Sequence, residues 1–396
     1  MKNISNISLS GKRVLIRVDF NVPLDDYFNI TDDSRIQAAL PTIKKVIQDG
    51  GKAIIMSHLG RPKKGVEERF SLRHIVKHLS TLLETSVKFS GDCIGKNTNT
   101  NISAMENGDV LVLENLRFYP EEELGDTTFA KQLANLADVY VNDAFGAAHR
   151  AHASTNIIAD YFPNEKYFGL LLSKEISSLK AALEKPKRPF TAIIGGAKIT
   201  GKIDVITSLF NKVDALIIGG GMAYTFAKAM GGNIGNSLVE EDKVELAKNL
   251  ITTAKEKGVR LFLPIDSVNA DSFSNDANIQ NSEMTNVPTG FMGLDIGPDS
   301  IAQFSKAILN SKTIIWNGPM GVFEMENFSN GTKKIGEAIC KATENGAFSL
   351  VGGGDSVSAV KQFGFSNKVS YISTGGGAML EYLKGKELPG VVAIQG

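Results

Sequence analysis

Cationic and hydrogen-bonding side chains follow the short apolar runs in the first half of this sequence. They are Asp19 and Asn21 after the run at 14–18, His58 and Arg61 after the run at 54–56, Arg117 after the run at 110–113, and Arg150 after the run at 139–141. Together with Arg35, the arginines can hold one small anion of more than one charge through their forked N–H donors. Asp19 and Asn21 can either accept hydrogen bonds from hydroxyl groups of that ligand or cap a turn. We therefore expect a small, phosphorylated and hydroxylated acid as the ligand of this half.

Glycine-rich turns follow the apolar runs of the second half, at 195–196, 219–221 and 352–354. Such turns bind phosphate through backbone N–H groups, usually where a helix begins. The N–H groups of Gly353, Gly354, Asp355 and Ser356 can receive phosphate oxygens, and the Asp355 carboxylate can face a divalent cation. Glu324 follows a further apolar run and can accept from ribose hydroxyls, or it can simply be solvated. These turns predict a nucleotide site.

Residues 196–202 match all but the last position of the phosphate-loop pattern G-x-x-x-x-G-K-[ST]. Ile203 stands where the pattern needs a hydroxyl to bind Mg²⁺, so we reject a true phosphate loop. Lys198 and Lys202 nevertheless remain at a strand-to-helix turn. No G-x-G-x-x-G occurs in these turns, which argues against a nicotinamide site.

The apolar runs predict how these residues are positioned. Short runs rich in β-branched residues and without polar alternation are typical of parallel strands covered on both faces, and helical patterns lie between them. We therefore predict an α/β fold with two doubly wound, parallel-sheet (Rossmann-like) domains. An amphipathic helix at 173–184, stopped by Lys185-Pro186, joins domain 1–172 to domain 185–375.

Composition excludes several classes of protein. The chain has 396 residues and equal numbers of basic and acidic side chains, 43 of each, so no net field attracts nucleic acid. Cys93 and Cys340, the two cysteines, are expected to be packing residues in a reducing compartment. The sequence begins without an apolar leader and has no apolar run long enough to cross a membrane, which predicts a cytoplasmic location. His74 and His78, one helical turn apart, are expected on a solvated face rather than at a metal.

Nine segments occur in an order that carries a family resemblance. They are Arg17–Pro23, His58–Pro62, Ala148–Ser154, Gly195–Lys198, Gly219–Ala223, Gly290–Pro298, Trp316–Pro319, Gly352–Asp355 and Ser373–Ala378. Through them the chain resembles the phosphoglycerate kinase family from end to end. In small departures, Ser356 stands where threonine is common and Asp26-Tyr27-Phe28-Asn29 replaces a turn with glycine.

The resemblance implies residues for both ligands and for catalysis. For 3-phosphoglycerate these are Asp19, Asn21, Arg35, His58, Leu59, Gly60, Arg61, Arg117 and Arg150. For ATP or ADP they are Lys202, Gly293, Asn317, Glu324, Gly353, Gly354, Asp355 and Ser356, with Asp355 at Mg²⁺. The catalytic cations are Arg35, Lys198 and Lys202. The resemblance also implies a hinge near Thr374–Gly377 and a segment 376–396 that returns to the first domain.

The family reaction moves a phosphoryl group reversibly between 1,3-bisphosphoglycerate and ADP. Its acceptor in the ATP-consuming direction is a carboxylate, so no general base is needed, and the sequence offers none beside the phosphate site. We expect a monomer whose two domains close around their ligands. The alternatives are a phosphate-loop ATPase, which Ile203 disfavours, a nicotinamide-dependent dehydrogenase, which lacks its fingerprint, and a non-catalytic binding protein, which would not need Lys198, Lys202 and Asp355.

Overall fold

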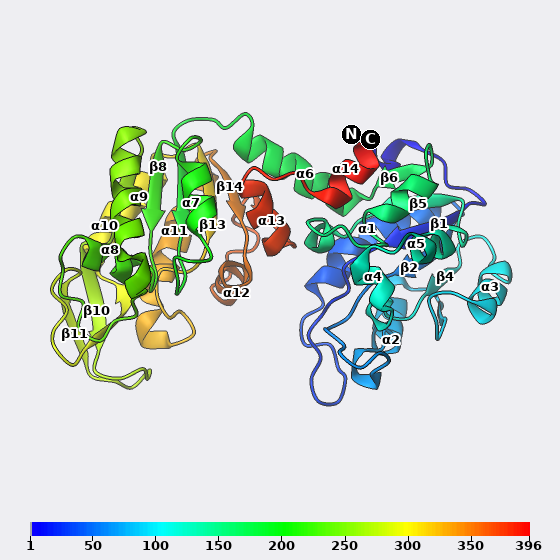
Figure 1. Cartoon of the computed structure of the whole chain (residues 1–396), viewed down its shortest axis with the longest axis horizontal. Coiled ribbons are helices and arrows are strands. Elements are labelled where there is room, and N and C mark those ends of the chain that lie inside the picture. The colour runs from blue at the N-terminus through cyan, green and yellow to red at the C-terminus, as the bar shows by residue number, and fades with distance from the viewer. Residues whose placement is uncertain (1) are drawn as a thin grey trace. The chain divides into compact units, whose positions relative to one another are not determined.

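The structure, a computed structural model, describes residues 2–396 as two compact units. The first unit holds the chain up to Ser177 together with Glu387–Gly396, and the second holds Ser178–Lys386. In each unit a six-stranded parallel sheet is accompanied by helices (Figure 1), so the predicted doubly wound α/β class is confirmed.

The sheet of the first unit has the strand order β3-β4-β2-β1-β5-β6. Its strands are β1 (Arg13–Arg17), β2 (Lys52–Met56), β3 (Val87–Phe89), β4 (Val110–Val112), β5 (Val139–Asn142) and β6 (Lys166–Phe168). Its helices are α1 (Ser34–Gln48), α2 (Arg73–Leu83), α3 (Lys96–Ser103), α4 (Pro120–Leu124), α5 (Thr127–Ala134), the start of α6 (Leu170–Leu183) and α14 (Pro389–Gln395). Every neighbouring pair is parallel, so all carboxyl ends meet at one edge.

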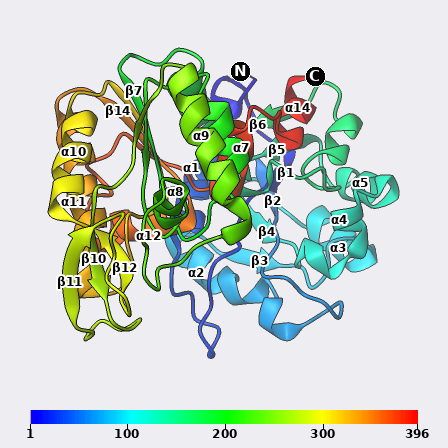
Figure 2. The same ribbon diagram turned by 60° about the vertical axis from the view of Figure 1, so that its left-hand side comes forward.

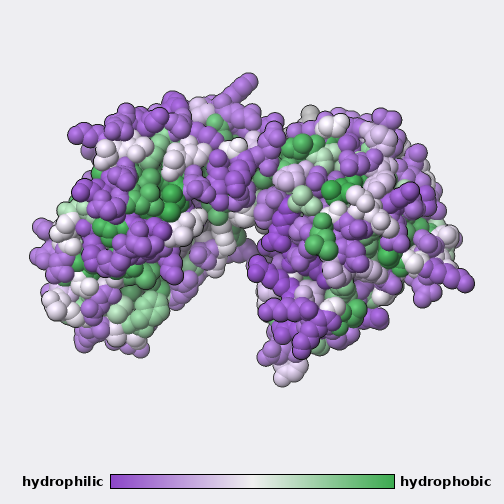
Figure 3. Space-filling model, viewed as in Figure 1, coloured by the Kyte–Doolittle hydropathy of each residue, from purple (hydrophilic) through white to green (hydrophobic). Residues whose placement is uncertain are grey.

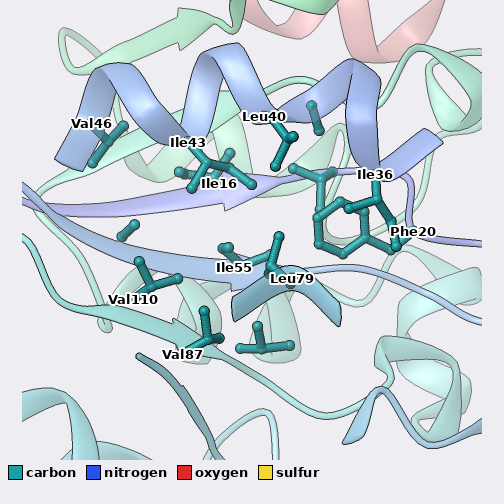
Figure 4. Close-up of a cluster of buried hydrophobic side chains, with 14 of the residues drawn as sticks. Ile16, Phe20, Ile36, Leu40, Ile43, Val46, Ile55, Leu79, Val87 and Val110 are labelled. Carbon is teal, nitrogen blue, oxygen red and sulfur yellow. The ribbon is translucent and has the colours of Figure 1, made fainter. Parts of the chain in front are cut away.

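The core of this unit shows why α1 packs where it does. Ile36, Leu40, Ile43 and Val46 repeat at helical spacing, are buried, and point from α1 toward the sheet in Figure 4. Burying each such side chain contributes about 1.5–3 kcal/mol. The packing fixes the start of α1, and with it Arg35, against the end of β1.

The main sheet of the second unit has the order β15-β14-β13-β7-β8-β9. Its strands are β7 (Phe190–Ile194), β8 (Ala215–Ile218), β9 (Arg260–Phe262), β13 (Thr313–Asn317), β14 (Phe348–Val351) and β15 (Tyr371–Ile372). Its helices are α7 (Ile203–Leu209), α8 (Ala223–Ala229), α9 (Val244–Glu256), α10 (Pro298–Leu309), α11 (Asn330–Glu344), α12 (Gly354–Gln362) and α13 (Gly376–Leu383).

A three-stranded antiparallel sheet, absent from the sequence prediction, completes the second unit. It has the order β11-β10-β12, with β10 (Asp266–Ala270), β11 (Ile279–Glu283) and β12 (Met292–Ile296), and Figure 2 shows the three strands together. Four of the five residues of β11 are exposed and most are polar, so this strand carries no apolar run. Backbone pairing to β10, rather than burial, defines it.

The joining helix and the C-terminal segment differ from their predicted bounds. The joining helix α6 begins at Leu170, before the predicted Ser173, because the carboxylate of Asp143 accepts from the N–H of Leu172 at 3.0 Å. Helix α13, which begins at Gly376, packs on α7 within the second unit. Of the predicted returning segment 376–396, only Glu387–Gly396 belongs to the first unit, where α14 contacts β6. Both differences come from long-range contacts that a local pattern does not carry.

The predicted solvated face at His74 and His78 is wrong for His74. Its side chain is only 13% exposed and its ring stacks on Phe28 with centroids 4.3 Å apart, while His78 Nε2 lies 2.9 Å from Asp33 Oδ2. The loop before α1 therefore covers part of α2. Cys93 and Cys340 are both free, and no helix within residues 2–396 is long and apolar enough to span a membrane.

Asp143 gives a pH-dependent test of the first unit. Burial raises the pKa of this carboxyl to about 6, so between pH 4 and 6 the folded chain binds a proton that the unfolded chain has released. Stability contributed by Asp143 should therefore fall as pH rises through this window, by on the order of 2–3 kcal/mol. Denaturant titrations of the wild type and Asp143→Asn should show the wild type losing stability relative to the variant from pH 4 to 6.

Asp138 provides a control of opposite sign for this measurement. It pairs with Arg13 at 2.7 Å, and the hydrogen bond from Arg13 lowers its pKa. The free energy of unfolding of the wild type, relative to that of Asp138→Asn, should therefore increase as pH rises through the acid range. If the difference in free energy of unfolding between the wild type and Asp143→Asn does not change with pH, the raised pKa of the Asp143 carboxyl is contradicted.

Candidate active site

The predicted substrate residues of the first unit come from the carboxyl edge of its sheet. Asp19 and Asn21 follow β1, His58 to Arg61 follow β2, Arg117 lies in the turn of 3₁₀ helix Leu116–Phe118 after β4, Arg150 follows β5, and Arg35 lies in the first turn of α1. Because parallel strands end at one edge, four strand ends and the first turn of α1 deliver side chains to one region.

The cations of this edge lie close enough together for their charges to lower the pKa values of His58 and Arg117. His58 is buried, and its pKa is held well below the ordinary value by burial first and then by the positive charges of Arg17, Arg117, Arg35 and Arg150. Burial also lowers the pKa of Arg117, with Arg150, Arg17 and Arg61 adding to the effect. The neutral His58 thus stands among arginines. An excess of positive charge in one place is what a multiply charged anion needs.

Arg17 belongs to this cluster, although the sequence analysis did not select it as a site residue. It is 1% exposed, its Nε donates to Ser154 Oγ at 2.8 Å, and its Nη2 lies 3.4 Å from His58 Nδ1. Arg17 lies within β1 rather than after it, so it is not among the residues that follow a strand. A charged residue inside an apolar run was the available signal.

Asn115 was also missed, and it organises the loop that follows β2. Its side chain is fully buried, donates to the carbonyl oxygens of Leu59 at 2.7 Å and Phe70 at 2.9 Å, and accepts from the Arg117 N–H at 3.0 Å. Arg117 Nη1 in turn donates to Gly60 O at 2.7 Å. Gly60 has φ +64° and packs against the Phe70 ring, which leaves no room for a Cβ. These contacts fix Leu59 and Gly60 beside Arg117.

Of the two roles that the sequence left open for Asp19 and Asn21, the structure shows the closing of a turn, by Asp19. Asp19 accepts from Arg35 Nη1 at 3.1 Å and from the N–H of Asn21 at 3.2 Å, so it orients a cation and closes a turn. Asn21 Oδ1 accepts from the Gly60 N–H at 2.8 Å. Both side chains therefore hold other site residues in place.

The second unit contains a cavity of about 470 Å³ at the ends of its strands. Glycine turns form part of its wall, through Gly196, Gly220, Gly221 and Gly321, and Leu238 and Phe273 contribute exposed apolar surface at 45% and 64% exposure. Hydrophobic residues are visible at the surface of this unit in Figure 3. A mainly apolar cavity of this size with a few polar groups suits a nucleotide.

Three of the predicted nucleotide residues, Gly293, Glu324 and Asp355, line this cavity. Gly293 is required by close packing, because a Cβ there would lie 1.6 Å from the Tyr224 hydroxyl oxygen. Glu324 and Asp355 are exposed and supply two of the acidic groups of the wall. The apolar wall and these acids lie on segments that are far apart in the sequence.

Gly353 and Gly354 begin α12, as the sequence predicts. Gly353 is the N-cap with φ +97°, and the first helical bond from this turn runs from the Val357 N–H to Gly353 O at 3.0 Å. The N–H groups of Gly354 and Asp355 precede it and have no acceptor within the helix. They can donate to an anion, which the positive end of the helix dipole also favours.

Ser356 and Asn317 turn inward instead of facing the cavity. Ser356 is fully buried and its Oγ accepts from the Gly318 N–H at 2.5 Å. Asn317 is 1% exposed, donates to Gly352 O at 2.7 Å, and accepts from Lys202 Nζ. The Asn317 side chain therefore ties β13 to the glycine turn before α12, and the Ser356 side chain ties α12 to Gly318, which follows β13.

The turn after β7 carries two lysines with different surroundings. Lys198 is exposed, whereas Lys202 is largely buried, and burial lowers its pKa while Asp355 opposes the shift. Glu240, which the sequence analysis missed, accepts from the Ile199 N–H at 2.5 Å and so holds the turn. The turn also contributes Gly196 and Ala197 to the cavity wall.

No group of three or more metal-ligating side chains occurs within residues 2–396. One exposed carboxylate beside a phosphate-binding turn does fit Mg²⁺, which in nucleotide sites keeps its waters and takes one or two carboxylates with the phosphates.

With this geometry established, comparison with known proteins identifies the family. The family model described as Phosphoglycerate kinase matches residues 4–386. The chain belongs to the phosphoglycerate kinase family. The predicted resemblance is thus confirmed, as is the prediction that the chain is a kinase of glycolysis.

Known phosphoglycerate kinases are similar in sequence to this chain over nearly its whole length. The phosphoglycerate kinase of Porphyromonas gingivalis is 55% identical and covers 99% of this chain and 100% of that protein, and that of Chlorobium phaeobacteroides is 54% identical over 99% of each. Among solved structures, phosphoglycerate kinase from Coxiella burnetii has a TM-score of 0.90 at 42% identity and covers 99% of this chain and 98% of that one. The enzyme from Pyrococcus horikoshii has a TM-score of 0.82 at 30% identity, with 100% and 98% covered.

Proposed function

We propose that this chain transfers a phosphoryl group reversibly between 1,3-bisphosphoglycerate and ADP, giving 3-phosphoglycerate and ATP. One observation carries the proposal: a single chain holds a cluster of arginines around a buried neutral His58 and, in its other unit, a nucleotide-sized cavity beside the start of α12. A kinase that joins these two ligands needs both sites.

Each ligand has its own set of residues in this proposal. The set for 3-phosphoglycerate is Asp19, Asn21, Arg35, His58, Leu59, Gly60, Arg61, Arg117 and Arg150, with Arg17 and Asn115 supporting it from beneath. The set for the nucleotide is Lys202, Gly293, Asn317, Glu324, Gly353, Gly354, Asp355 and Ser356. Charge decides the assignment, because the first set is cationic and the second combines backbone N–H groups with an apolar wall.

No proton needs to be removed from the acceptor in this reaction. The attacking group is a carboxylate, which is ionised at neutral pH because its pKa is about 4. The low pKa of His58 keeps this ring uncharged, so it can donate one ring N–H to the ligand without adding a further charge. Positioning and charge compensation are what remain for the protein to supply.

Arg35, Lys198 and Lys202 are the cations that we assign to the transferring phosphoryl group. Arg35 is held by Asp19 at 3.1 Å, and Lys202 is held by Asn317, so both are oriented before substrate binds. A preoriented cation stabilises negative charge without paying for reorganisation at the moment of transfer. Asp355 would hold Mg²⁺, which supplies further neutralisation of the nucleotide phosphates when bound.

The decisive experiment traps the acyl phosphate. Mg-ATP and 3-phosphoglycerate are incubated with the enzyme in the presence of hydroxylamine, which converts an acyl phosphate into a hydroxamate. We expect hydroxamate to form only when enzyme and both substrates are present. ADP release that is indifferent to 3-phosphoglycerate would instead favour the ATPase alternative, and no turnover would favour a binding role.

Separate ligand sites also predict a change in the shape of the chain during turnover. Because each unit binds one ligand, transfer requires the reacting oxygens to be brought together and water to be excluded. We expect small-angle scattering to give a smaller radius of gyration with 3-phosphoglycerate and a non-hydrolysable nucleotide together than with either alone. The same radius in all states would contradict closure.

We further propose a cytoplasmic monomer. Each ligand site is built from one chain, and the zero formal net charge gives no general attraction to nucleic acid or anionic membranes. Gel filtration coupled to light scattering should give 42.6 kDa. Twice this mass would contradict the monomer.

A further inference from the structure

Asp295 is a buried carboxyl in the wall of the nucleotide cavity with no role in the site described above. It lies in β12 and is 3% exposed. Its Oδ1 accepts from the Ile296 N–H at 2.9 Å and its Oδ2 from the Gly331 N–H at 2.7 Å. Gly331 lies in the first turn of α11, whose own N-cap residue, Ser329, makes no capping bond through its side chain. The cap of α11 therefore comes from another element.

Two glycines enclose this carboxyl group. A Cβ on Gly321 or on Gly331 would lie 2.2 Å from Asp295 Oδ1, well inside van der Waals contact. Gly331 belongs to α11, and Gly321 belongs to the segment 318–324 that follows β13 and ends in Glu324. Three elements thus meet at one side chain.

The segment 318–324 is tied to the same two elements that Asp295 joins. The Val322 N–H donates to Leu294 O in β12 at 2.8 Å, and the Met320 N–H donates to Thr332 Oγ1 in α11 at 3.0 Å. If β12 and α11 shift relative to one another, this segment must move with them. Burial raises the pKa of Asp295 to about 7, so an ionised carboxylate here costs stability at neutral pH.

We propose that Asp295 is a positioning residue for the nucleotide. It sets the distance between β12, which carries Gly293, and segment 318–324, which carries Glu324, and these are two walls of one cavity. The inference rests on the proposed nucleotide site. It predicts an effect on nucleotide affinity, with none on 3-phosphoglycerate and little on the transfer step.

Asp295→Asn tests this inference, because the amide nitrogen is a donor that would face a backbone N–H donor. Losing one acceptor in a buried site should raise KM for Mg-ATP about tenfold, keep kcat within about twofold, and leave KM for 3-phosphoglycerate unchanged. Trp316, the single tryptophan, donates through Nε1 to Gly318 O at 2.8 Å at the start of the segment. Its fluorescence gives the Kd for Mg-ADP without turnover, and this Kd should rise by the same factor.

Asp266→Asn is the matched control. Asp266, in β10 of the same small sheet, accepts from the N–H groups of Asp299 at 2.9 Å and Ser300 at 2.8 Å at the start of α10, and Gly297 packs on its carboxyl. It lies outside the residues that line the cavity. Asp266→Asn should lower the melting temperature to a similar extent and leave the Kd for Mg-ADP unchanged. An equal loss of nucleotide affinity in both variants would overturn the inference.

Thr332→Val keeps the proposal testable if Asp295→Asn does not fold. It preserves shape and removes the acceptor for the Met320 N–H, so the Kd for Mg-ADP should again rise while KM for 3-phosphoglycerate stays constant. An unchanged Kd in Thr332→Val would refute the positioning role. Failure of the wild type itself to bind Mg-ADP would instead refute the proposed nucleotide site.

Discussion

Lys198→Ala should lower kcat by about two to three orders of magnitude while each KM stays within about threefold. Lys198 is exposed in the turn after β7, whose neighbouring residues Gly196 and Ala197 line the nucleotide cavity. An exposed, flexible ammonium contributes little to ground-state binding. Lys198 would instead stabilise the negative charge that is redistributed during transfer. Water has then been excluded from the site, so charge interactions are strongest. Steady-state kinetics in both directions measure the effect.

Lys257→Ala is a suitable control for this measurement. Lys257 is exposed at the end of α9 and lies outside the cavity wall, so its loss should change neither kcat nor KM. Arg35→Ala is a less clean test, because it also frees the Asp19 carboxylate from its partner at 3.1 Å. An unchanged kcat in Lys198→Ala would remove this residue from the catalytic set, and a raised KM alone would make it a binding residue.

The sequence predicts which cationic side chains lie together in the first unit, because parallel strands place their carboxyl ends at one edge of the sheet. Strand ends meet at one edge, so Arg61, Arg117 and Arg150 can be grouped before their positions are known, and the coupling to His58 and Arg117 confirms that they are close. Arg17 and Asn115 escape this rule for different reasons. Arg17 lies inside its strand, and the importance of Asn115 depends on its contacts with Leu59 and Phe70, which are distant in the sequence.

The parts of the fold that could not be predicted depend on contacts between distant residues. Helix α6 starts early because Asp143 binds the Leu172 N–H, and α11 is capped by Asp295 rather than by Ser329. β11 pairs as an exposed polar strand, so neither hydrophobic periodicity nor an apolar run predicts it. A local pattern reveals an element that buries its own apolar face, but not one whose ends are fixed by a remote side chain.

Gly354→Val should raise the Kd for Mg-ADP by about ten- to a hundredfold, because a side chain there would keep phosphate oxygens from the backbone N–H groups at the start of α12. At Gly354 the loss of nucleotide affinity can be measured without a change in folding. No heavy atom lies within 4 Å of a Cβ at Gly354, whereas at Gly353 the backbone has φ +97° and a Cβ would lie 2.7 Å from Asn317 Nδ2. Gly353→Val would therefore strain the fold, and Gly354→Val should leave the melting temperature unchanged or higher.

Calorimetric titration of Mg-ADP into Gly354→Ala and Gly354→Val should show a graded loss, larger for the larger side chain, with KM for 3-phosphoglycerate unaltered. Gly91→Val is the matched control, since this glycine of the first unit also has open space around its Cβ position and no positive φ. It should leave nucleotide binding at the wild-type value. Full affinity in Gly354→Val would mean that the phosphates do not approach this turn, and the assignment of Gly353, Gly354 and Asp355 to the nucleotide would then fail with it.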